Sequence, residues 1–207
     1  MFRTMKTWLS DSSPFIPRRR RLLLGSAVLF SLAACDQKVT LKLHGVDLST
    51  MPLAGTFQLR DFNGNLRSLN DFRGDIVILL FGYTHCPDVC PTSLARAAQI
   101  KVLLGDKGNK LQVLFVSVDP ERDTPEILKA YTTAFDPTFV GLYGDAEQTA
   151  NVAKAFGAFY RKVPSGDSYT MEHSSLDYVI DTTGHLRFAL RYEESAQDCV
   201  DDLRQLL

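Results

Sequence analysis

Two uninterrupted apolar runs of strand length place the strongest constraint on the fold of this chain. They cover residues 75–82 and 111–118. Such runs, without polar alternation, are typical of strands buried on both faces of a sheet. The segment 91–104 lies between them, and Pro91 suits the first position of a helix. This segment repeats an apolar residue at helical spacing: Leu94, Ala98 and Val102. Strand, helix and strand in this order predict a βαβ unit with parallel strands.

Further elements flank this unit on both sides. Asn63-Gly64 between the strand-like segments 56–62 and 66–69 predicts an N-terminal β-hairpin. After the unit we expect, in order, a helix, a strand, a helix, a hairpin and a final helix, over 125–135, 138–143, 146–156, 175–191 and 195–207. The order predicts an α/β fold with a central mixed sheet flanked by helices, which is the plan of the thioredoxin superfamily.

The first 34 residues have the pattern of a bacterial export signal. Six of the 23 basic residues precede residue 22, and an apolar run follows over 22–34. Roughly thirteen apolar residues suit a signal peptide, because a membrane-spanning helix needs about twenty. Leu32-Ala33-Ala34-Cys35 resembles a lipobox, whose cysteine becomes lipidated, and an uncleaved signal anchor is the alternative. Both interpretations predict an exported domain anchored at the membrane, and Asp36 favours the periplasmic side of the inner membrane.

We therefore divide the chain into a signal peptide of the lipoprotein type (1–34), a membrane-proximal tether (35–53) and one folded domain (54–207). The hydrophobic content of 45% and charged content of 23% are ordinary for such a domain. Without residues 1–34 the chain has 17 basic and 23 acidic residues, a net charge of −6. An acidic domain has no general attraction for phosphate backbones, so we expect no nucleic-acid partner.

The segment Gly82-Tyr-Thr-His-Cys86-Pro-Asp-Val-Cys90-Pro91 joins a buried strand to a helix, where ligands bind in open α/β sheets. Cysteines four positions apart at a helix start can bring their sulfurs together. Cys90 would lie at the helix N-terminus, which favours the thiolate form. The sequence thus predicts a reactive dithiol. A plain disulfide or a zinc site remains possible, although a short disulfide loop adds little stability and zinc would need a further ligand.

Three motifs in this order resemble the SCO/SenC family. They are Phe81-Gly-Tyr-Thr-His-Cys-Pro-Asp-Val-Cys-Pro91, Asp119-Pro-Glu-Arg-Asp-Thr124, and His173-Ser174 before a strand ending at Asp181. The resemblance runs from about residue 54 to the C-terminus. It implies a thioredoxin-like copper-binding domain in which Cys86, Cys90 and His173 hold one copper ion. Two thiolates suit Cu(I), and an added imidazole suits Cu(II), so the donor set is consistent with copper in both oxidation states.

Other residues of these motifs receive weaker assignments. Asp119 follows a parallel strand and could hydrogen-bond the cysteine loop behind the metal ligands, or act only as a turn residue. Asp123 and Thr124 are expected to cap the next helix. His85 is expected to pack or hydrogen-bond rather than bind metal, since adjacent side chains at a strand end point to opposite sides. Cys199 shares a helix face with apolar residues, which predicts a buried cysteine.

The resemblance implies a copper chaperone for the binuclear copper centre of cytochrome c oxidase subunit II. Such a chaperone would need a copper donor and a thiol reductant as further partners. The alternative is a membrane-tethered thiol–disulfide reductase that uses Cys86 and Cys90 to keep the cysteines of its client reduced. A copper-responsive redox sensor is a third interpretation. A peroxidase is disfavoured, because Thr84 has the wrong spacing from both cysteines. We do not expect a conventional enzyme.

Overall fold

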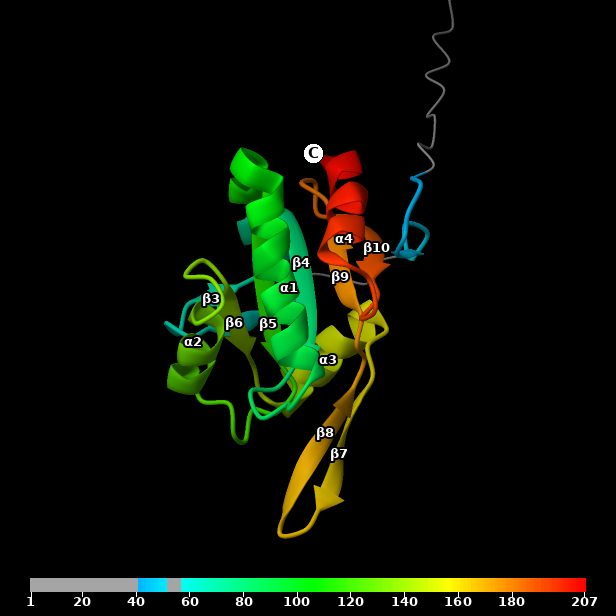
Figure 1. The fold of residues 1–207 in the computed structure, drawn as a ribbon. Coiled ribbons are helices and arrows are strands. Elements are labelled where there is room, and N and C mark those ends of the chain that lie inside the picture. Colours follow the sequence, from blue (N-terminus) through cyan, green and yellow to red (C-terminus); the bar gives the residue numbers. More distant parts are fainter. Residues whose placement is uncertain (1–40, 52–56) are drawn as a thin grey trace, which may run out of the picture. The chain divides into compact units, whose positions relative to one another are not determined.

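The structure is a computed structural model that describes residues 41–51 and 57–207. Its centre is an eight-stranded mixed sheet (Figure 1). In their order across the sheet, the strands are β1 (Val46–Asp47), β10 (Leu186–Leu190), β9 (Asp177–Ile180), β4 (Ile76–Gly82), β5 (Leu111–Ser117), β6 (Val140–Tyr143), β2 (Leu59–Asp61) and β3 (Leu66–Arg67). The pairs β4–β5 and β5–β6 are parallel, and the other pairs are antiparallel. The expected α/β fold with its βαβ unit and N-terminal hairpin is confirmed.

Helices cover both faces of this sheet. They are α1 (Val89–Leu104), α2 (Pro125–Thr133), α3 (Ala146–Phe156) and α4 (Ala196–Leu203), with 3-10 helices η1 (Leu69–Phe72), η2 (Gly105–Lys110) and η3 (Arg204–Leu206). Every residue of β4 is buried, and its side chains alternate between two hydrophobic clusters. Val152 of α3 lies in one cluster, whereas Leu94 of α1, Leu128 of α2 and Val200 of α4 lie in the other. The continuous apolar run of β4 is therefore explained by burial on both faces.

Helix α1 differs from the expectation in its start and in its buried face. It begins at Val89, so Pro91 is its third residue rather than its first. The residues that it buries include Leu94, Ala97, Ile100 and Leu104, whereas Val102 is 79% exposed. The predicted stripe was wrong because steps of four residues advance about 40° beyond a full turn, which carries the third position away from the sheet.

A second sheet lies outside the central one and was not predicted. It is a hairpin of β7 (Tyr160–Ser165) and β8 (Ser168–His173), in which Tyr160 pairs with His173. Figure 1 shows this hairpin extending away from the central sheet. Its strands are mostly exposed and contain Pro164, so they lack the apolar run or clean alternation that identifies a strand in a sequence.

Residues 41–47 are attached to the folded domain. Val46 pairs with Ala189 of β10, and Leu43 packs against the cluster that contains α1. These residues lie within the segment 35–53 that the sequence assigns to a tether, whereas Cys35 lies outside the described residues. The division of the chain into signal, tether and domain stays a prediction. Among the described residues, no helix has the length and apolar character to cross a membrane.

Candidate metal centre

The two motif cysteines lie in the loop that follows β4 and in the first turn of α1. Cys90 is the second residue of α1 and is 3% exposed, whereas Cys86, in the preceding loop, is half-buried. Gly82 ends β4, and a Cβ atom at this position would lie 2.5 Å from the Cys90 sulfur and 2.8 Å from the Phe115 ring. Because no real Cβ tolerates such contacts, glycine at 82 is what allows the Cys90 sulfur to lie against the strand.

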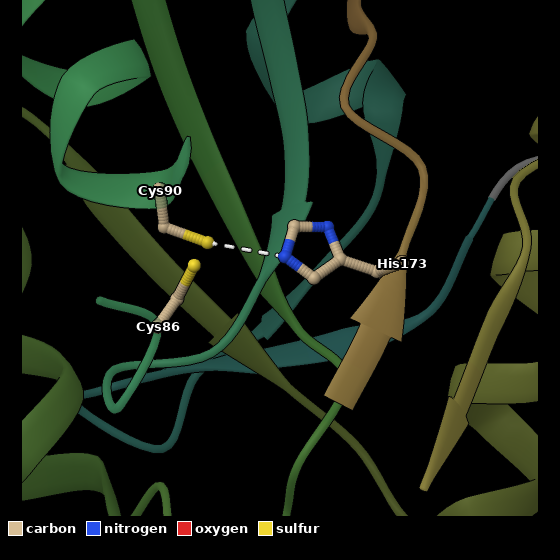
Figure 2. Close-up of side chains that lie close together, drawn as sticks. All are labelled: Cys86, Cys90 and His173. Atoms are coloured by element: carbon tan, nitrogen blue, oxygen red, sulfur yellow. Dashed lines mark hydrogen bonds between the residues drawn. The ribbon is translucent and has the colours of Figure 1, made fainter. Parts of the chain in front are cut away.

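His173 completes a cluster with the two cysteines, as Figure 2 shows. Its Nε2 atom lies 3.4 Å from the Cys90 sulfur, although 83 positions separate the residues. The two sulfurs and a ring nitrogen of His173 all lie within 4.8 Å of one another. The structure therefore brings together the three residues that the sequence proposes as ligands.

A hydrogen bond fixes the orientation of the His173 ring. Its Nδ1 atom lies 2.9 Å from the carbonyl oxygen of Ser174. A carbonyl oxygen can only accept, so Nδ1 carries the proton of this bond. In the neutral ring, Nε2 then presents its lone pair to the sulfurs, as a metal ligand must. The ring of Tyr83 packs edge-on against the His173 ring, with centroids 6.0 Å apart, and limits its rotation further.

The two cysteines differ strongly in acidity, and the difference is the reverse of the prediction. A hydrogen bond from the Cys90 thiol lowers the pKa of Cys86 to about 3, against an opposing effect of burial. The backbone N–H groups of Cys90 and Asp88 also favour the Cys86 thiolate. The same thiol–thiolate bond, together with burial, raises the pKa of Cys90. The prediction was wrong because the N–H groups at the start of α1 point to the Cys86 sulfur in the loop.

The pKa of the His173 imidazole is also shifted. Burial alone would lower its pKa, but the hydrogen bond to Cys86, the bond to Ser174 and the negative charge of Cys86 together raise it. The thiolate of Cys86 therefore stabilises the protonated form of the His173 ring, and burial opposes this effect. Metal binding must displace protons from such a site, because only thiolates and neutral imidazole act as ligands.

One side of the cluster opens to solvent. An open groove of about 520 Å³ is lined by Tyr83, Cys86, Pro87, Asp88, Val89, Phe159, Thr170, Met171, Glu172 and His173. Behind Cys90 and His173 the space is only about 10 Å³, which fits no more than one water molecule. A ligand group from another molecule can therefore approach the cluster from the groove, beside the exposed ring of Phe159.

A buried ion pair lies between α1 and the central sheet. Arg96 of α1 donates to Asp177 of β9 at 2.6 Å, and both side chains are at least nine-tenths buried. The same guanidinium donates to the backbone carbonyls of Arg191, Tyr192 and Glu194. The pair joins the helix that carries Cys90 to the central sheet. The sequence analysis missed it, and the only signal was one Arg within the apolar face of a helix.

Asp119 is a turn residue, the second of the two roles that the sequence suggested, since its carbonyl oxygen accepts from the N–H groups of Arg122 and Asp123. Asp123 has a role that the sequence did not suggest. The carboxylate of Asp119 accepts hydrogen bonds from Arg122 and from the hydroxyl of Tyr169 rather than from the cysteine loop. Asp123 contacts the cysteine loop instead, because it accepts from the backbone N–H and the hydroxyl of Thr84. The helix cap after it is formed by Thr124. Sequence reasoning missed the contact of Asp123 with Thr84 because both carboxyls follow the same strand in one short motif, and spacing does not show which of them faces the cysteine loop.

The remaining assignments agree with the structure. Cys199 is fully buried in α4, as expected. The exposed His85 lies 3.2 Å from the Thr84 hydroxyl and does not join the cluster. Two thiolates and one imidazole around an open position form a soft donor set that fits copper, and a closed structural zinc site would need a fourth protein ligand.

Comparisons with known proteins were consistent with this site. The sequence profile of the SCO1/SenC family matches residues 47–207. An SCO2-like protein of Rickettsia felis is 31% identical over 188 residues, which cover 88% of this chain and 92% of that protein. The structure of Bradyrhizobium japonicum ScoI with copper bound has a TM-score of 0.68 at 39% identity, over 74% of this chain and 98% of that one. A SCO1/SenC family lipoprotein from Bacillus anthracis has a TM-score of 0.65 at 25% identity, over 80% and 97%.

Proposed function

The chain belongs to the SCO1/SenC family, and we propose that it is a copper chaperone that holds one copper ion through Cys86, Cys90 and His173. The observation that carries this proposal is the cluster of the three side chains, whose ligand atoms lie within 4.8 Å of one another. The similarity to ScoI with copper bound supports the choice of metal. Two sulfurs suit Cu(I), and the imidazole extends the range of the site to Cu(II).

Transfer of copper would proceed by ligand exchange at the groove. The more exposed cysteine, Cys86, faces this groove, whereas Cys90 lies behind it in the first turn of α1. An acceptor thiol or imidazole entering from solvent would first replace the bond to Cys86, and Cys90 and His173 would hold the ion during the exchange. Both cysteines must be reduced for this step, which implies a thiol reductant and a copper donor as partners.

The client that we propose is the binuclear copper centre of cytochrome c oxidase subunit II. The family resemblance carried by the motifs supports this assignment. We further propose that Cys35 is the lipidated first residue of the mature protein, after removal of residues 1–34, and that the domain faces the periplasm from the inner membrane. The lipoprotein from Bacillus anthracis supports a lipid anchor within this family. An anchor would raise the local concentration of the chaperone near a membrane-bound client.

The pKa of Cys86, lowered to about 3, favours a second function. A thiolate beside a protonated thiol is the arrangement that a thiol–disulfide reductase needs for attack. The protein could therefore reduce the copper-binding cysteines of its client with the same dithiol. His173 separates the two functions, since copper retention requires its nitrogen whereas disulfide exchange requires only the sulfurs.

The decisive experiment loads the reduced protein with Cu(II) and records its absorption and electron paramagnetic resonance spectra. Wild type should show sulfur-to-copper charge-transfer bands and coupling to a nitrogen nucleus. Cys86→Ala and Cys90→Ala should lose the charge-transfer bands of the wild-type site. His173→Ala should lose the nitrogen coupling and bind Cu(II) at least about tenfold more weakly. The variant His85→Ala is the matched control, and it should behave as wild type.

Disulfide exchange is measured on the same proteins with a small disulfide substrate. Reductase activity that survives in His173→Ala, together with loss of Cu(II) retention, would support both functions in one site. If His173→Ala binds Cu(II) as wild type does, the proposed ligand set is contradicted and the dithiol interpretation remains.

A further inference from the structure

We propose that the segment 119–123, between β5 and α2, positions the metal ligands by holding the cysteine loop and the His173 hairpin at a fixed separation. This inference rests on the proposed function, because it assigns positioning residues to the same site. The juxtaposition that carries it is the attachment of two distant parts of the chain to one turn of five residues, in which the side chains of Asp119 and Asp123 are buried.

The first attachment is made by Asp123, which is 2% exposed. The backbone N–H of Thr84 lies 3.2 Å from each of its carboxylate oxygens, and the Thr84 hydroxyl donates to it at 2.6 Å. The hydroxyl of Ser117, at the end of β5, donates to the same carboxylate at 2.6 Å. Because Thr84 lies two residues before Cys86, these bonds fix the start of the cysteine loop to the end of β5.

The second attachment is made by Asp119 and Arg122. Asp119 is 3% exposed and accepts from Nε of Arg122 at 2.5 Å and from the Tyr169 hydroxyl at 2.8 Å. Arg122 also donates to the backbone carbonyl of Tyr169 at 3.0 Å. Tyr169 belongs to β8, four positions before His173 on the same strand. The position of β8 relative to the cysteine loop therefore depends on bonds to this carboxylate and guanidinium, together with the burial of Met171 in the core and the ion pair of Lys162 with Glu121 at 2.6 Å.

Stacking strengthens the second attachment. The guanidinium carbon of Arg122 lies 3.7 Å from the centroid of the Tyr169 ring, and Nζ of Lys162 lies 3.8 Å from the same centroid. Arg122 also lies 5.7 Å from the ring of Tyr83, which packs edge-on against His173. Arg122 thus touches both the strand that carries His173 and the aromatic ring that limits rotation of the imidazole.

The two attachments form one unit because the segment itself is a hydrogen-bonded turn. The backbone N–H groups of Arg122 and Asp123 both donate to the carbonyl oxygen of Asp119, at 3.1 and 3.0 Å. In contrast, β7 and β8 pair only with each other among the strands that the structure describes. The hairpin has no ladder to the central sheet, so the burial of Met171 and side-chain bonds set its distance from Cys90. Asp119, Arg122 and Tyr169 contribute such bonds.

Two conservative variants test the second attachment. Tyr169→Phe removes the hydroxyl that bonds Asp119 and keeps the ring. Arg122→Lys keeps the charge but removes the paired donors to Asp119 and Tyr169. In both variants we expect weaker nitrogen coupling in the Cu(II) spectrum and about a tenfold loss of Cu(II) affinity, the usual effect of removing a group that orients a ligand. Cu(I) affinity, which the two sulfurs dominate, should change less than about threefold.

Arg161→Gln is the matched control on the same hairpin. It removes an ion pair of similar length, from Arg161 to Glu172 at 2.7 Å, but this pair joins β7 to β8 and does not attach the hairpin to the 119–123 segment. Its Cu(II) spectrum and affinity should match wild type. Thermal unfolding of each apo variant is recorded in parallel, so that a loss of nitrogen coupling is interpreted only in folded protein.

The outcomes separate this proposal from the proposed function. The positioning role would be overturned if the nitrogen coupling is lost in His173→Ala but unchanged in Tyr169→Phe and Arg122→Lys. The ligand set would then remain intact. If the nitrogen coupling is absent from wild type, or is the same in His173→Ala, the ligand set is overturned, and the positioning role is overturned with it. Reduced coupling and selective loss of Cu(II) affinity in both variants, but not in Arg161→Gln, would establish the role of the 119–123 segment.

Discussion

The sulfurs of Cys86 and Cys90 lie within 4.8 Å of each other, and the interaction of the Cys90 thiol with the Cys86 thiolate makes the two cysteines chemically unequal. Cys86 lies at the groove and has its pKa lowered to about 3. Cys90 lies behind it, and its pKa is raised. Because the pKa of Cys90 is raised and that of Cys86 is lowered, the reactive sulfur is the one that solvent and partners can reach.

The reduced, copper-free protein should therefore react with iodoacetamide first at Cys86. The alkylation rate of this residue should change less than about threefold between pH 5 and pH 8, because Cys86 is a thiolate throughout this range. An ordinary cysteine, with a pKa of about 8.5, would instead react roughly tenfold faster for each unit of pH over most of this range. Peptide mapping by mass spectrometry assigns the modified residue.

Two substitutions of Cys90 sharpen this test. Cys90→Ser keeps a hydroxyl donor and should preserve fast reaction at pH 5. Cys90→Ala removes the donor, so the pKa of Cys86 should rise and its rate should become strongly dependent on pH. Equal rates for Ser and Ala variants at pH 5 would show that the hydrogen bond from Cys90 is not what ionises Cys86.

The absence of a side chain at Gly82 leaves space for the Cys90 sulfur, and this leads to a further prediction. Gly82→Ala would place a Cβ atom 2.5 Å from the Cys90 sulfur, so we expect the sulfur to move and copper affinity to fall by about tenfold or more. Overpacking should also cost about 1–3 kcal/mol of stability. Gly141→Ala is the control, since its Cβ atom would contact Leu128 at 3.1 Å, away from the site. Similar copper binding in both variants would contradict the prediction.

Much of the fold could be predicted because its signals are local. The apolar runs of β4 and β5 and the caps of α2 and α3 follow from residues that are close in the sequence. The hairpin of β7 and β8 could not be predicted in this way. Its strands are largely exposed, so hydrophobic burial does not impose a period on their sequence, and long-range side-chain bonds hold them in place.

In the candidate site, too, only the residues with local sequence signals could be predicted from the sequence itself. Cys86 and Cys90 could be predicted to be neighbours, because they share one loop and one helix start. His173 required the family resemblance, since nothing local indicates that a residue 83 positions after Cys90 reaches its sulfur. The order of the two cysteine pKa values was predicted wrongly. That order depends on which sulfur the N–H groups face, and sequence spacing does not carry this information.

Substitution of the buried Arg96 should strongly lower the free energy of unfolding. Arg96→Met leaves the buried carboxylate of Asp177 without its cation, which should cost about 3–5 kcal/mol at pH 8. Urea unfolding monitored by circular dichroism measures the loss. Arg204→Met is the control, because its ion pair with Asp201 is exposed and should contribute less than about 1 kcal/mol.

The effect of Arg96→Met should depend on pH in a defined direction. Burial raises the pKa of Asp177 to about 6, although Arg96 opposes the shift. A carboxyl with a raised folded-state pKa contributes stability that is complete below about 3.8 and is lost as pH rises through about 6. At pH 5 Asp177 is largely neutral even in wild type, so the substitution should cost less there than at pH 8. An equal cost at both values would exclude the ion pair as its cause.

Asp202 attaches the segment before β1 to the domain, and its removal should release that segment. The side chain is fully buried in α4 and accepts the backbone N–H groups of His44 at 3.0 Å and Gly45 at 2.9 Å. Asp202→Ala leaves both N–H groups without this acceptor, so we expect a loss of about 1–3 kcal/mol and faster hydrogen exchange at His44 and Gly45.

Asp198→Ala separates this effect from a general weakening of α4. Asp198 lies on the same helix and 3.8 Å from the His44 ring, but it is exposed and does not accept the two backbone N–H groups. Exchange at Gly45 should therefore remain slow in Asp198→Ala. Fast exchange at Gly45 in wild type would mean that the segment moves independently of the domain. Slow exchange that depends on Asp202 would mean that part of the predicted tether is held on the domain, which limits how far an anchored copper site can extend from the membrane.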